Sequence, residues 1–348
     1  MAAQTETRSR PKMRVAMIGV GLASRPHAQS LVDLGDRVEV AVAVAKSTAR
    51  LADFGRNFPF PTSTRLEDVL ADPGITAALV LTPPDTHVEL VTRLAQAGKH
   101  VLLEKPLALD LAGATEVVAA CERAGVTLAV VLQHRFRPAA ETLTRLVAAG
   151  QLGELAGASV AVRWWRPQAY YDEPGRGTRA RDGGGVLMTQ AIHTLDLFLS
   201  LAGEPAEVSA FAATTALHRM ECEDIVAGAL RFRNGAVGAI DATTACFPGF
   251  PERVELIGTK GTAILTGGRL EVSFQDGRTE TFGSGEATGS GANPMGFSHE
   301  PHRALIADFL GAVETRRPPR VSGRDALRVH RVIDALIRSS TARQIVTL

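Results

Sequence analysis

The feature that most constrains the fold is a regular alternation of short apolar runs and amphipathic segments over residues 14–136. Aliphatic residues, many of them β-branched, fill the runs, and apolar residues spaced three or four apart mark the segments between them. The expected strands are 14–21, 37–45, 75–84, 100–106 and 126–136, and the expected helices are 25–35, 48–58, 87–98 and 111–125. Buried strands that alternate with helices predict a parallel sheet covered on both faces, in a doubly wound α/β fold.

The pattern changes after residue 136, where longer runs replace the alternation. The motifs "RNGA" and "TGGR" stand between apolar runs, where hairpin turns are expected. The expected elements are a helix at 138–150, strands within 155–166, 206–214, 224–245 and 254–276, and closing helices at 302–316 and 322–342. We therefore predict a second α/β domain with an open, mainly antiparallel sheet, and a helix at 183–201 inserted between its first two strands.

Composition excludes several classes of function. The formal net charge is +1 and aromatic residues make up 5% of the chain, which argues against a nucleic-acid partner. Three cysteines show no metal-ligand spacing and suggest reduced thiols. No apolar run has the length of a membrane span or the form of a signal peptide, so we expect a cytoplasmic protein without a membrane partner and with a frayed N-terminal tail.

A glycine loop follows the first predicted strand, in "VAMIGVGLAS". Gly19 permits a tight turn, and Gly21 lets the backbone approach a pyrophosphate at the start of the next helix. Ser24 replaces the third glycine of the usual fingerprint, and Leu22 and Ala23 complete the loop. In the context of the strands and helices that follow, the loop predicts a dinucleotide site. The alternative is a glycine turn without a ligand.

The end of the second strand indicates which dinucleotide is bound. An acid usually stands there when the cofactor lacks a 2′-phosphate. This chain has Lys46, Ser47 and Arg50 instead, and Glu39 lies too early in the strand. We expect NADP(H) to be preferred over NAD(H), unless these cations are ordinary solvated side chains.

A second motif is "GGGVLMTQAIHTLDLFLSL", residues 183–201. Thr189, His193, Asp196 and Ser200 recur at spacings of four, three and four, which predicts that they share one face of a helix. The acidic stretch "ECEDIV", residues 221–226, carries its polar residues consecutively and lacks a histidine, so we expect no metal site there.

Together, the glycine loop, "TPPDTHVEL", "AGKHVLLEKPLALD" and "GGGVLMTQAIHTLD" resemble the Gfo/Idh/MocA oxidoreductases, the glucose-fructose oxidoreductase and inositol dehydrogenase group. The resemblance runs from about Met13 to the C-terminal "QIVTL". It implies a Rossmann domain at 12–135 and a substrate-binding and oligomerisation domain at 136–348. Members mostly oxidise or reduce hydroxyl and carbonyl groups of sugars and polyols, and their open sheet commonly forms dimer or tetramer contacts.

The resemblance also implies catalytic roles. Lys105 of "EKP" matches the family's active-site lysine, which polarises the reacting oxygen. His193 matches the acid/base that exchanges a proton with the substrate hydroxyl. Thr189 stands where many members carry an aspartate, so it offers a hydrogen bond without charge. The alternatives are a lysine paired structurally with Glu104 and a histidine that is simply buried.

Other expected site residues follow from position. Thr82, Pro83, His87, Glu104 and Lys105 lie at the strand ends expected to face the dinucleotide. The residues expected to bind substrate, besides Lys105, Thr189 and His193, are Arg163, Trp165, Arg176 and His302. The aromatic and arginine-rich segment can equally form an oligomer contact. His87, His299 and His302 can equally be helix-start residues.

The function expected from these motifs is NADP-dependent hydride transfer to or from a sugar, polyol or sugar acid, in a homodimer or homotetramer without a bound metal. Two alternatives stay open. One is a glycosidase that acts by transient oxidation with a tightly bound cofactor. The other is a regulatory protein that senses a dinucleotide without catalysis.

Overall fold

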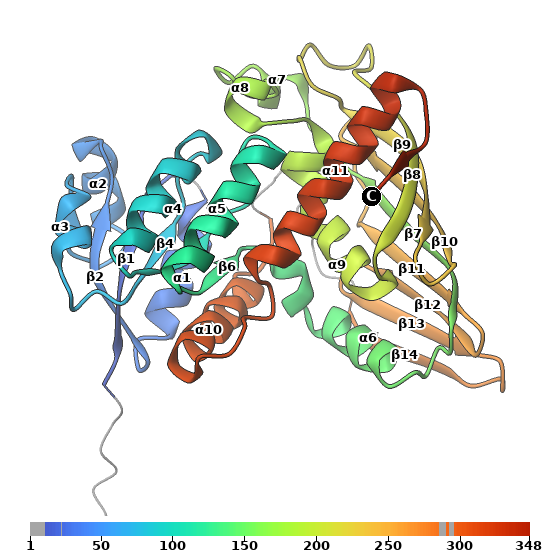
Figure 1. Cartoon of the computed structure of the whole chain (residues 1–348), viewed down its shortest axis with the longest axis horizontal. Coiled ribbons are helices and arrows are strands. Elements are labelled where there is room, and N and C mark those ends of the chain that lie inside the picture. The colour runs from blue at the N-terminus through green and yellow to red at the C-terminus, as the bar shows by residue number, and fades with distance from the viewer. Residues whose placement is uncertain (1–10, 22, 285–289, 292–295) are drawn as a thin grey trace, which may run out of the picture.

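The computed structural model describes residues 11–21, 23–284, 290–291 and 296–348, and it contains two sheets side by side (Figure 1). The first sheet belongs to the N-terminal half and the second to the C-terminal half. Leu22 of the glycine loop lies outside the described residues, as does most of the Gly/Ser-rich stretch before the closing helices.

The first sheet is parallel throughout, with the strand order β3-β2-β1-β4-β5-β6. The reversal of strand order beside β1 is that of a doubly wound dinucleotide-binding fold, which confirms the predicted class. Its strands are β1 (Met13–Ile18), β2 (Val38–Val44), β3 (Thr62–Ser63), β4 (Ala77–Val80), β5 (His100–Leu103) and β6 (Leu128–Val130). Its helices are α1 (Ser24–Asp33), α2 (Thr48–Gly55), α3 (Glu67–Ala71), α4 (His87–Gln96) and α5 (Leu111–Ala124), with a 3₁₀ turn, η1 (Pro84–Thr86).

Two details of this half differ from expectation. The short elements β3 and α3 were not predicted, because neither is long enough to show a hydrophobic period. The last parallel strand, β6, ends at Val130, and the chain then turns into the 3₁₀ helix η2 (Gln133–Phe136). This early end matters because η2 brings further polar side chains to the edge of the sheet.

The second sheet has nine strands in the order β14-β13-β12-β11-β7-β10-β9-β8-β15. Only β7 and β10 pair in parallel, so the mainly antiparallel prediction is confirmed, and both expected hairpins form. The strands are β7 (Leu155–Arg163), β8 (Pro205–Ala213), β9 (Ile225–Phe232), β10 (Val237–Thr243), β11 (Arg253–Gly258), β12 (Gly261–Thr266), β13 (Arg269–Phe274), β14 (Thr279–Gly283) and β15 (Val346–Thr347).

Helices cover one face of the second sheet and leave the other face open (Figure 1). Ala158, Val160 and Val162 of β7 point to the covered face and are buried. On the open face, Val237 and Ile257 are about half exposed. The helices of this half are α6 (Pro138–Ala148), α7 (Gln168–Tyr171), α8 (Arg179–Asp182), α9 (Ile192–Ala202), α10 (Glu300–Thr315) and α11 (Gly323–Ala342).

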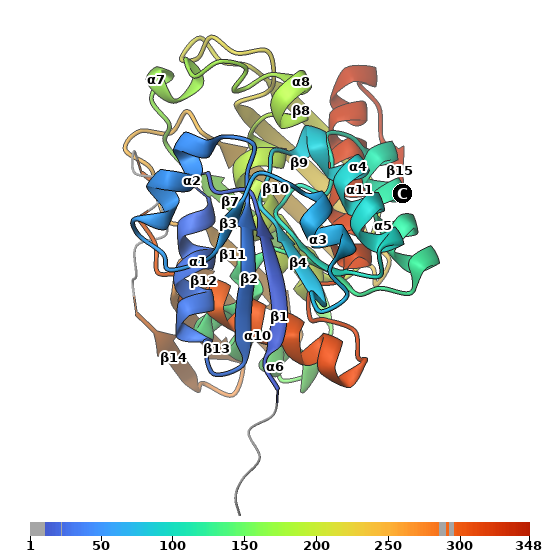
Figure 2. The same cartoon turned by 90° about the vertical axis from the view of Figure 1, so that its left-hand side faces the viewer.

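The end of the chain returns to the first sheet. Helix α10 packs beside α1, and α11 lies between α5 and the second sheet (Figures 1 and 2). A β-bridge between Ala129 and Ser322 joins the last parallel strand to the segment before α11. The closing helices α10 and α11 therefore tie the C-terminal part of the chain to the first sheet.

One run, Arg179–Ala202, is long and apolar enough to cross a membrane by length and composition. In the folded chain 89% of its apolar window is buried inside the protein. The run is the core helix that carries His193, which explains its apolar character.

Candidate active site

The glycine loop between β1 and α1 has the shape of a phosphate cradle. Gly19 has φ +102°, and a Cβ there would lie 2.8 Å from the main chain of Leu81. A Cβ on Gly21 would meet nothing within 4 Å. Ser24 donates its hydroxyl to the Gly21 carbonyl at 2.6 Å, and Ala23 is the exposed N-cap of α1. Since no side chain caps α1, its first N–H groups fit the pyrophosphate of a dinucleotide.

The end of β2 presents cations rather than an acid. Lys46 and Arg50 are exposed, and neither forms an ion pair within the part of the chain that the structure describes. Ser47 caps α2, where its hydroxyl accepts the Arg50 N–H at 3.3 Å. Glu39 lies in the middle of the strand and faces Arg14 at 3.4 Å. The surface expected to hold an adenosine ribose is therefore basic.

The segment after β4 is fixed by hydrogen bonds. Thr82 and Thr86 share a side-chain hydrogen bond of 2.7 Å across Pro83. His87 is fully buried, and its ring nitrogens lie 2.9 Å from the Thr82 carbonyl and 3.0 Å from the Pro106 carbonyl. Of the two interpretations of His87, the structure favours the helix-start residue, which ties two loops of the dinucleotide edge together.

Lys105 lies directly after β5, at the carboxyl edge of the parallel sheet. Its ammonium donates to the main-chain oxygen of Thr189 at 2.7 Å. Burial lowers the pKa of Lys105, and the Glu104 carboxylate opposes that shift. Glu104 itself bonds His27 at 2.8 Å, so no carboxylate lies within ion-pair distance of this ammonium among the described residues. The alternative of a lysine paired with Glu104 is therefore wrong.

His193 is 9% exposed, and its ring makes no hydrogen bond to any residue that the structure describes. Its Nδ1 atom is buried without a partner. Burial holds the pKa of His193 well below the ordinary value, and the Lys105 ammonium lowers it further. The ring of His134 lies 5.3 Å away. The imidazole is therefore neutral at neutral pH, with ring nitrogens that no described residue occupies.

Thr189 lies in a π-helical turn, Leu187–Ala191, that precedes α9. Its hydroxyl donates to the Gly185 carbonyl at 2.7 Å and also contacts the side-chain oxygen of Gln190. The hydroxyl therefore does not orient the His193 ring, contrary to expectation. Thr189 contributes to the site through its main-chain oxygen, which holds Lys105.

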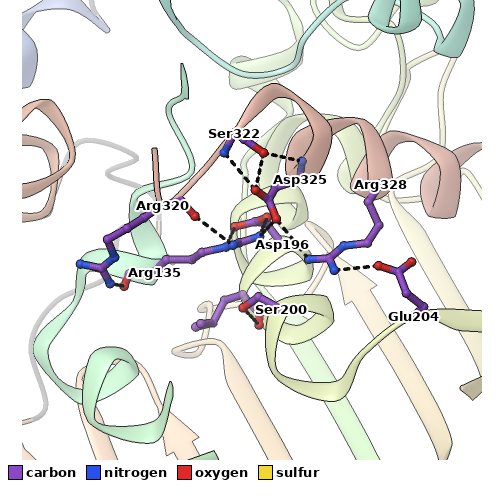
Figure 3. A network of polar contacts seen from close by, with 9 residues as sticks. Arg135, Asp196, Ser200, Glu204, Arg320, Ser322, Asp325 and Arg328 are labelled. Atoms are coloured by element: carbon purple, nitrogen blue, oxygen red, sulfur yellow. Dashed lines mark hydrogen bonds and ion pairs between the residues drawn. The ribbon is translucent and has the colours of Figure 1, made fainter. Parts of the chain in front are cut away.

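Asp196 is committed to a buried ion pair. Its carboxylate accepts the Arg135 Nε–H at 2.6 Å, and Arg135 also lies 3.5 Å from Asp325 of α11 (Figure 3). Ser200 donates its hydroxyl to the Leu197 carbonyl. Asp196 and Ser200 therefore do not bond the His193 ring, and Asp196 instead anchors the histidine helix to η2 and α11.

His302 lies at the start of α10, buried beside the same site. Its ring packs edge-on against His27 with centroids 5.0 Å apart, and it stacks on Phe297 at 5.6 Å. Burial lowers the pKa of His302 to about 3. Donor atoms of His27, Glu104 and His302 lie within 4.8 Å of one another, the one such trio within the described ranges. The His27–Glu104 hydrogen bond already occupies one donor atom of each of these two residues.

The segment before the histidine helix supplies a wall of stacked side chains. The centroid of the Tyr170 ring lies 4.2 Å from the guanidinium carbon of Arg176 and 5.7 Å from that of Arg166. Arg176 also donates to the Tyr170 hydroxyl at 2.7 Å, and Gln190 of the π turn donates to it at 3.4 Å. Tyr170 and Lys105 therefore both bond the π turn, at Gln190 and at the adjacent Thr189. Both arginines add to the lowering of the Lys105 pKa that burial causes.

Two of the singled-out residues lie elsewhere. Arg163 pairs with Asp241 at 2.6 Å on the open face of the second sheet, because side chains alternate along β7 and the histidine helix packs on the other face. Its expected role in substrate binding is therefore wrong. His299 bonds Asp33 of α1 at 2.7 Å on the surface, as the helix-start interpretation implies.

Trp165 is intermediate between the residues of the site and the two residues that lie elsewhere. Its ring is partly buried and packs edge-on against Phe247 at 5.5 Å. Because the neighbouring Phe247 ring is exposed, Trp165 lies near the protein surface. A role for Trp165 in substrate binding stays a prediction.

The sequence interpretation missed polar residues on η2. His134 bonds Arg137 at 2.7 Å, and Arg137 forms an ion pair with Glu252. Arg137 also lowers the pKa of His193, so its charge reaches the site. The signal was available, since "QHRFR" follows the last parallel strand at the same edge as "EKP".

The arrangement combines three chemical capacities at one edge of the parallel sheet. The glycine loop fits a dinucleotide pyrophosphate, the neutral His193 ring accepts a proton, and the Lys105 ammonium stabilises negative charge on an oxygen. These capacities suit proton and hydride exchange at a carbon that bears oxygen.

Comparisons with known proteins agree with the fold described above. Residues 13–132 match the profile of GFO/IDH/MocA, an oxidoreductase family with an NAD-binding Rossmann fold, and residues 140–264 match the GFO/IDH/MocA C-terminal domain. The 1,5-anhydro-D-fructose reductase of Ensifer adhaerens is 32% identical over 270 residues, which span 76% of this chain and 77% of that protein.

Two further relatives cover almost the whole chain. The myo-inositol 2-dehydrogenase of Thermotoga maritima is 27% identical over 323 residues, 90% of this chain and 92% of that protein. The crystal structure of the WlbA dehydrogenase from Bordetella pertussis in complex with NADH and UDP-GlcNAcA is 29% identical, with a TM-score of 0.83 over 97% of this chain and 99% of that one.

Proposed function

Because this chain belongs to the GFO/IDH/MocA family of oxidoreductases, we propose that it moves a hydride between a nicotinamide dinucleotide and a carbon of a sugar, polyol or sugar acid. The observation that carries the proposal is the convergence of Lys105 and the unbonded His193 ring at the carboxyl edge of the parallel sheet. Relatives named as an inositol dehydrogenase, an anhydrofructose reductase and a sugar-acid complex support this substrate class.

In the proposed oxidation, the His193 imidazole takes the proton of the substrate hydroxyl while Lys105 stabilises the negative charge that grows on the same oxygen. An ammonium has three donors, and the Thr189 carbonyl holds one of them, so the others remain for the substrate. A bound nicotinamide supplies the acceptor or donor of the hydride. In reduction, His193 returns the proton.

We propose that the wall of Arg166, Tyr170 and Arg176 binds the substrate together with His302. The open part of the Tyr170 face suits the C–H face of a sugar ring, and the guanidiniums suit hydroxyl or carboxylate oxygens. Glu173 pairs with Arg176 at 2.6 Å, so a substrate carboxylate has to compete with this ion pair. Hydroxyl-rich and acidic sugars are the substrates to test.

We propose that NADP(H) is preferred over NAD(H), on the basis of Lys46, Ser47 and Arg50 at the end of β2. The WlbA structure is in complex with NADH, so the proposed preference rests on these three residues alone. Fluorescence titration with NADPH and NADH tests it directly. Equal dissociation constants for the two dinucleotides refute the preference without touching the oxidoreductase assignment.

The experiment for the function itself is spectrophotometric. Purified protein is incubated with NADP⁺ or NAD⁺ and a panel of aldoses, inositols, sugar acids and anhydrosugars, and absorbance is followed at 340 nm. Reduced dinucleotide formed with one of these compounds supports the proposal. Tight dinucleotide binding without turnover favours a sensor, and cleavage of a chromogenic glycoside without added cofactor favours the glycosidase alternative.

We also propose the division of labour implied by the family, with residues 12–135 for the dinucleotide and 136–348 for substrate and assembly. The open face of the second sheet exposes Phe211, Val237 and Ile257, and burial of these side chains favours a homodimer or homotetramer. Light scattering of the purified protein gives the oligomeric state. Replacement of Phe211 and Ile257 by lysine is expected to produce monomers.

A further inference from the structure

The acidic stretch 221–226 takes no part in the chemistry proposed above, yet one of its side chains reaches the histidine helix. Glu223 lies just before β9, in the connection that follows β8. Its carboxylate points at the start of the π turn, where it accepts the Gly185 N–H at 3.1 Å and the Leu187 N–H at 3.3 Å. The Glu223 main-chain oxygen accepts the Val186 N–H at 2.9 Å.

These contacts meet a general need of helices. The first N–H groups of a helix have no acceptor within the helix, and a carboxylate is favoured at this positive end of the dipole. Burial raises the pKa of Glu223, and the N–H donors of Leu187 and Gly185 oppose that rise by favouring the ionised form. One residue from a distant loop thus satisfies three consecutive backbone donors.

Gly185 makes this close approach possible. A Cβ at this position would lie 1.8 Å from the Glu223 carbonyl oxygen, which is an impossible contact. The third glycine of "GGG" is therefore required by the capping loop. The close contact with Glu223 therefore explains the glycine at this position before the histidine helix.

A continuous path of hydrogen bonds joins Glu223 to the reactive lysine. The Gly185 carbonyl accepts the Thr189 N–H at 3.0 Å and the Thr189 hydroxyl at 2.7 Å. The Thr189 carbonyl in turn holds the Lys105 ammonium at 2.7 Å. A shift of the first turn therefore moves the group that aims Lys105.

We infer that Glu223 is a positioning residue for hydride transfer: it fixes the first turn of the histidine helix and, through Thr189, the ammonium of Lys105. The inference rests on the proposed function, because it concerns the same lysine. The Glu223 carboxylate bonds the main chain of Gly185 and Leu187, so its role is distinct from those of Lys105 and His193.

The kinetic test compares Glu223→Gln and Glu223→Ala with Glu221→Gln in the full-length protein. Glu221 is the matched control, since it lies two residues earlier and is exposed. Among the described residues its carboxylate bonds Arg179, whose main-chain N–H it accepts at 3.2 Å and whose Nε lies 3.9 Å away. We expect kcat to fall about tenfold in Glu223→Gln, which keeps one acceptor oxygen, and about hundredfold in Glu223→Ala, since misplacement of a catalytic group costs about this much.

The division between kinetic constants separates positioning from binding. KM and the dissociation constant of the reduced dinucleotide are expected to stay within about twofold of the wild-type values, because the Glu223 carboxylate bonds the main chain of the histidine helix. A wild-type kcat in Glu223→Ala, or a change confined to KM, overturns the inference. Partial recovery of kcat in Glu223→Gln relative to Glu223→Ala supports it.

A second readout does not depend on turnover. Hydrogen–deuterium exchange at residues 185–187 is expected to accelerate in Glu223→Ala and not in Glu221→Gln. Acetylation of Lys105 by acetic anhydride, followed by mass spectrometry, is expected to accelerate as well, because the ammonium loses its fixed acceptor. Unchanged exchange or unchanged Lys105 labelling overturns the inference. If no substrate is found, the proposed function fails while these two measurements still decide the role of Glu223.

Discussion

Removal of the Arg135 side chain tests the anchor of the histidine helix. Arg135 is mostly buried and holds the fully buried Asp196 carboxylate through two nitrogens (Figure 3). The variant Arg135→Met leaves that carboxylate without its partner, and such a loss costs about 3–5 kcal/mol of unfolding free energy. An unfolding entropy of about 2.1 cal/mol/K per residue over 348 residues converts this into a Tm loss of about 4–7 °C.

The loss depends on pH with a definite sign. Burial already raises the pKa of Asp196, and Arg135 is the main group that opposes the rise. Without Arg135 the pKa rises further, so the ionised carboxylate destabilises the variant most at neutral pH. As the pH falls toward the unfolded-state pKa of aspartate, about 3.9, the carboxyl becomes neutral in both proteins and the Tm difference shrinks.

Differential scanning fluorimetry at pH 7.5 and 5.5 measures both effects. Arg324→Met is the matched control, because Arg324 pairs with Glu122 on the surface and little change is expected there. The double variant Arg135→Met/Asp196→Leu is expected to recover most of the loss, since it leaves no unpaired buried charge. A loss in Arg135→Met no larger than in the control, or a loss that grows at pH 5.5, refutes the reasoning.

Three further predictions concern single side chains. Gly19→Ala is expected to lower both Tm and dinucleotide affinity, because the new Cβ would lie 2.8 Å from the main chain of Leu81. Gly21→Ala is expected to keep the wild-type Tm and to lose affinity only, because its Cβ would meet nothing within 4 Å. Equal Tm values for the two variants in a thermal melt contradict this prediction. Lys46→Glu is expected to weaken NADPH binding about tenfold and leave NADH binding unchanged, by fluorescence titration. His330 is buried with its pKa lowered to about 4, and its Nε2 accepts the Leu107 N–H at 3.0 Å. The stability that the neutral ring contributes is therefore complete above about pH 6.5 and is lost as the pH falls toward about 4. His330→Gln is expected to flatten this acid loss in urea melts, and an identical pH dependence of the two proteins counts against the prediction.

The sequence predicted the first domain well because its strands are buried on both faces and read as continuous apolar runs. The resemblance of "EKP" to the family motif singled out Lys105, and its place after a buried strand agreed, since the carboxyl ends of parallel strands share one edge of the sheet. The sequence interpretation missed β3, α3 and the turn η2, which are too short to carry a period. It therefore also missed Arg137, which directly follows η2 and adds to the lowering of the His193 pKa caused by burial and by Lys105.

The histidine helix shows a different limit. A regular period of 3.6 residues placed Thr189, His193 and Asp196 on one face. A π turn at Leu187–Ala191 interrupts that period, and the partner that claims Asp196 is Arg135, 61 residues away along the chain. Neither a local change of helix type nor a distant ion pair is encoded in the spacing of polar residues.

The arginine-rich segment illustrates a third limit. Arg163 and Arg166 are three residues apart, yet only Arg166 belongs to the wall beside Lys105. Strand β7 ends at Arg163, which points to the open face of the sheet, and the chain then turns toward the histidine helix. The face of the sheet on which an arginine side chain lies depends on where the strand ends, and strand ends are the least determined part of a sequence pattern.

The most direct test of the central claim is the rate of hydride transfer in His193→Ala, measured by stopped flow at 340 nm with the substrate found in the panel. Loss of the general base is expected to slow the step by a factor of about 10²–10⁴ at pH 7, while the affinity for reduced dinucleotide stays at the wild-type value. The variant's rate is then expected to rise about tenfold per pH unit, as hydroxide replaces the imidazole. A wild-type rate in His193→Ala contradicts the assignment of His193 as the acid/base.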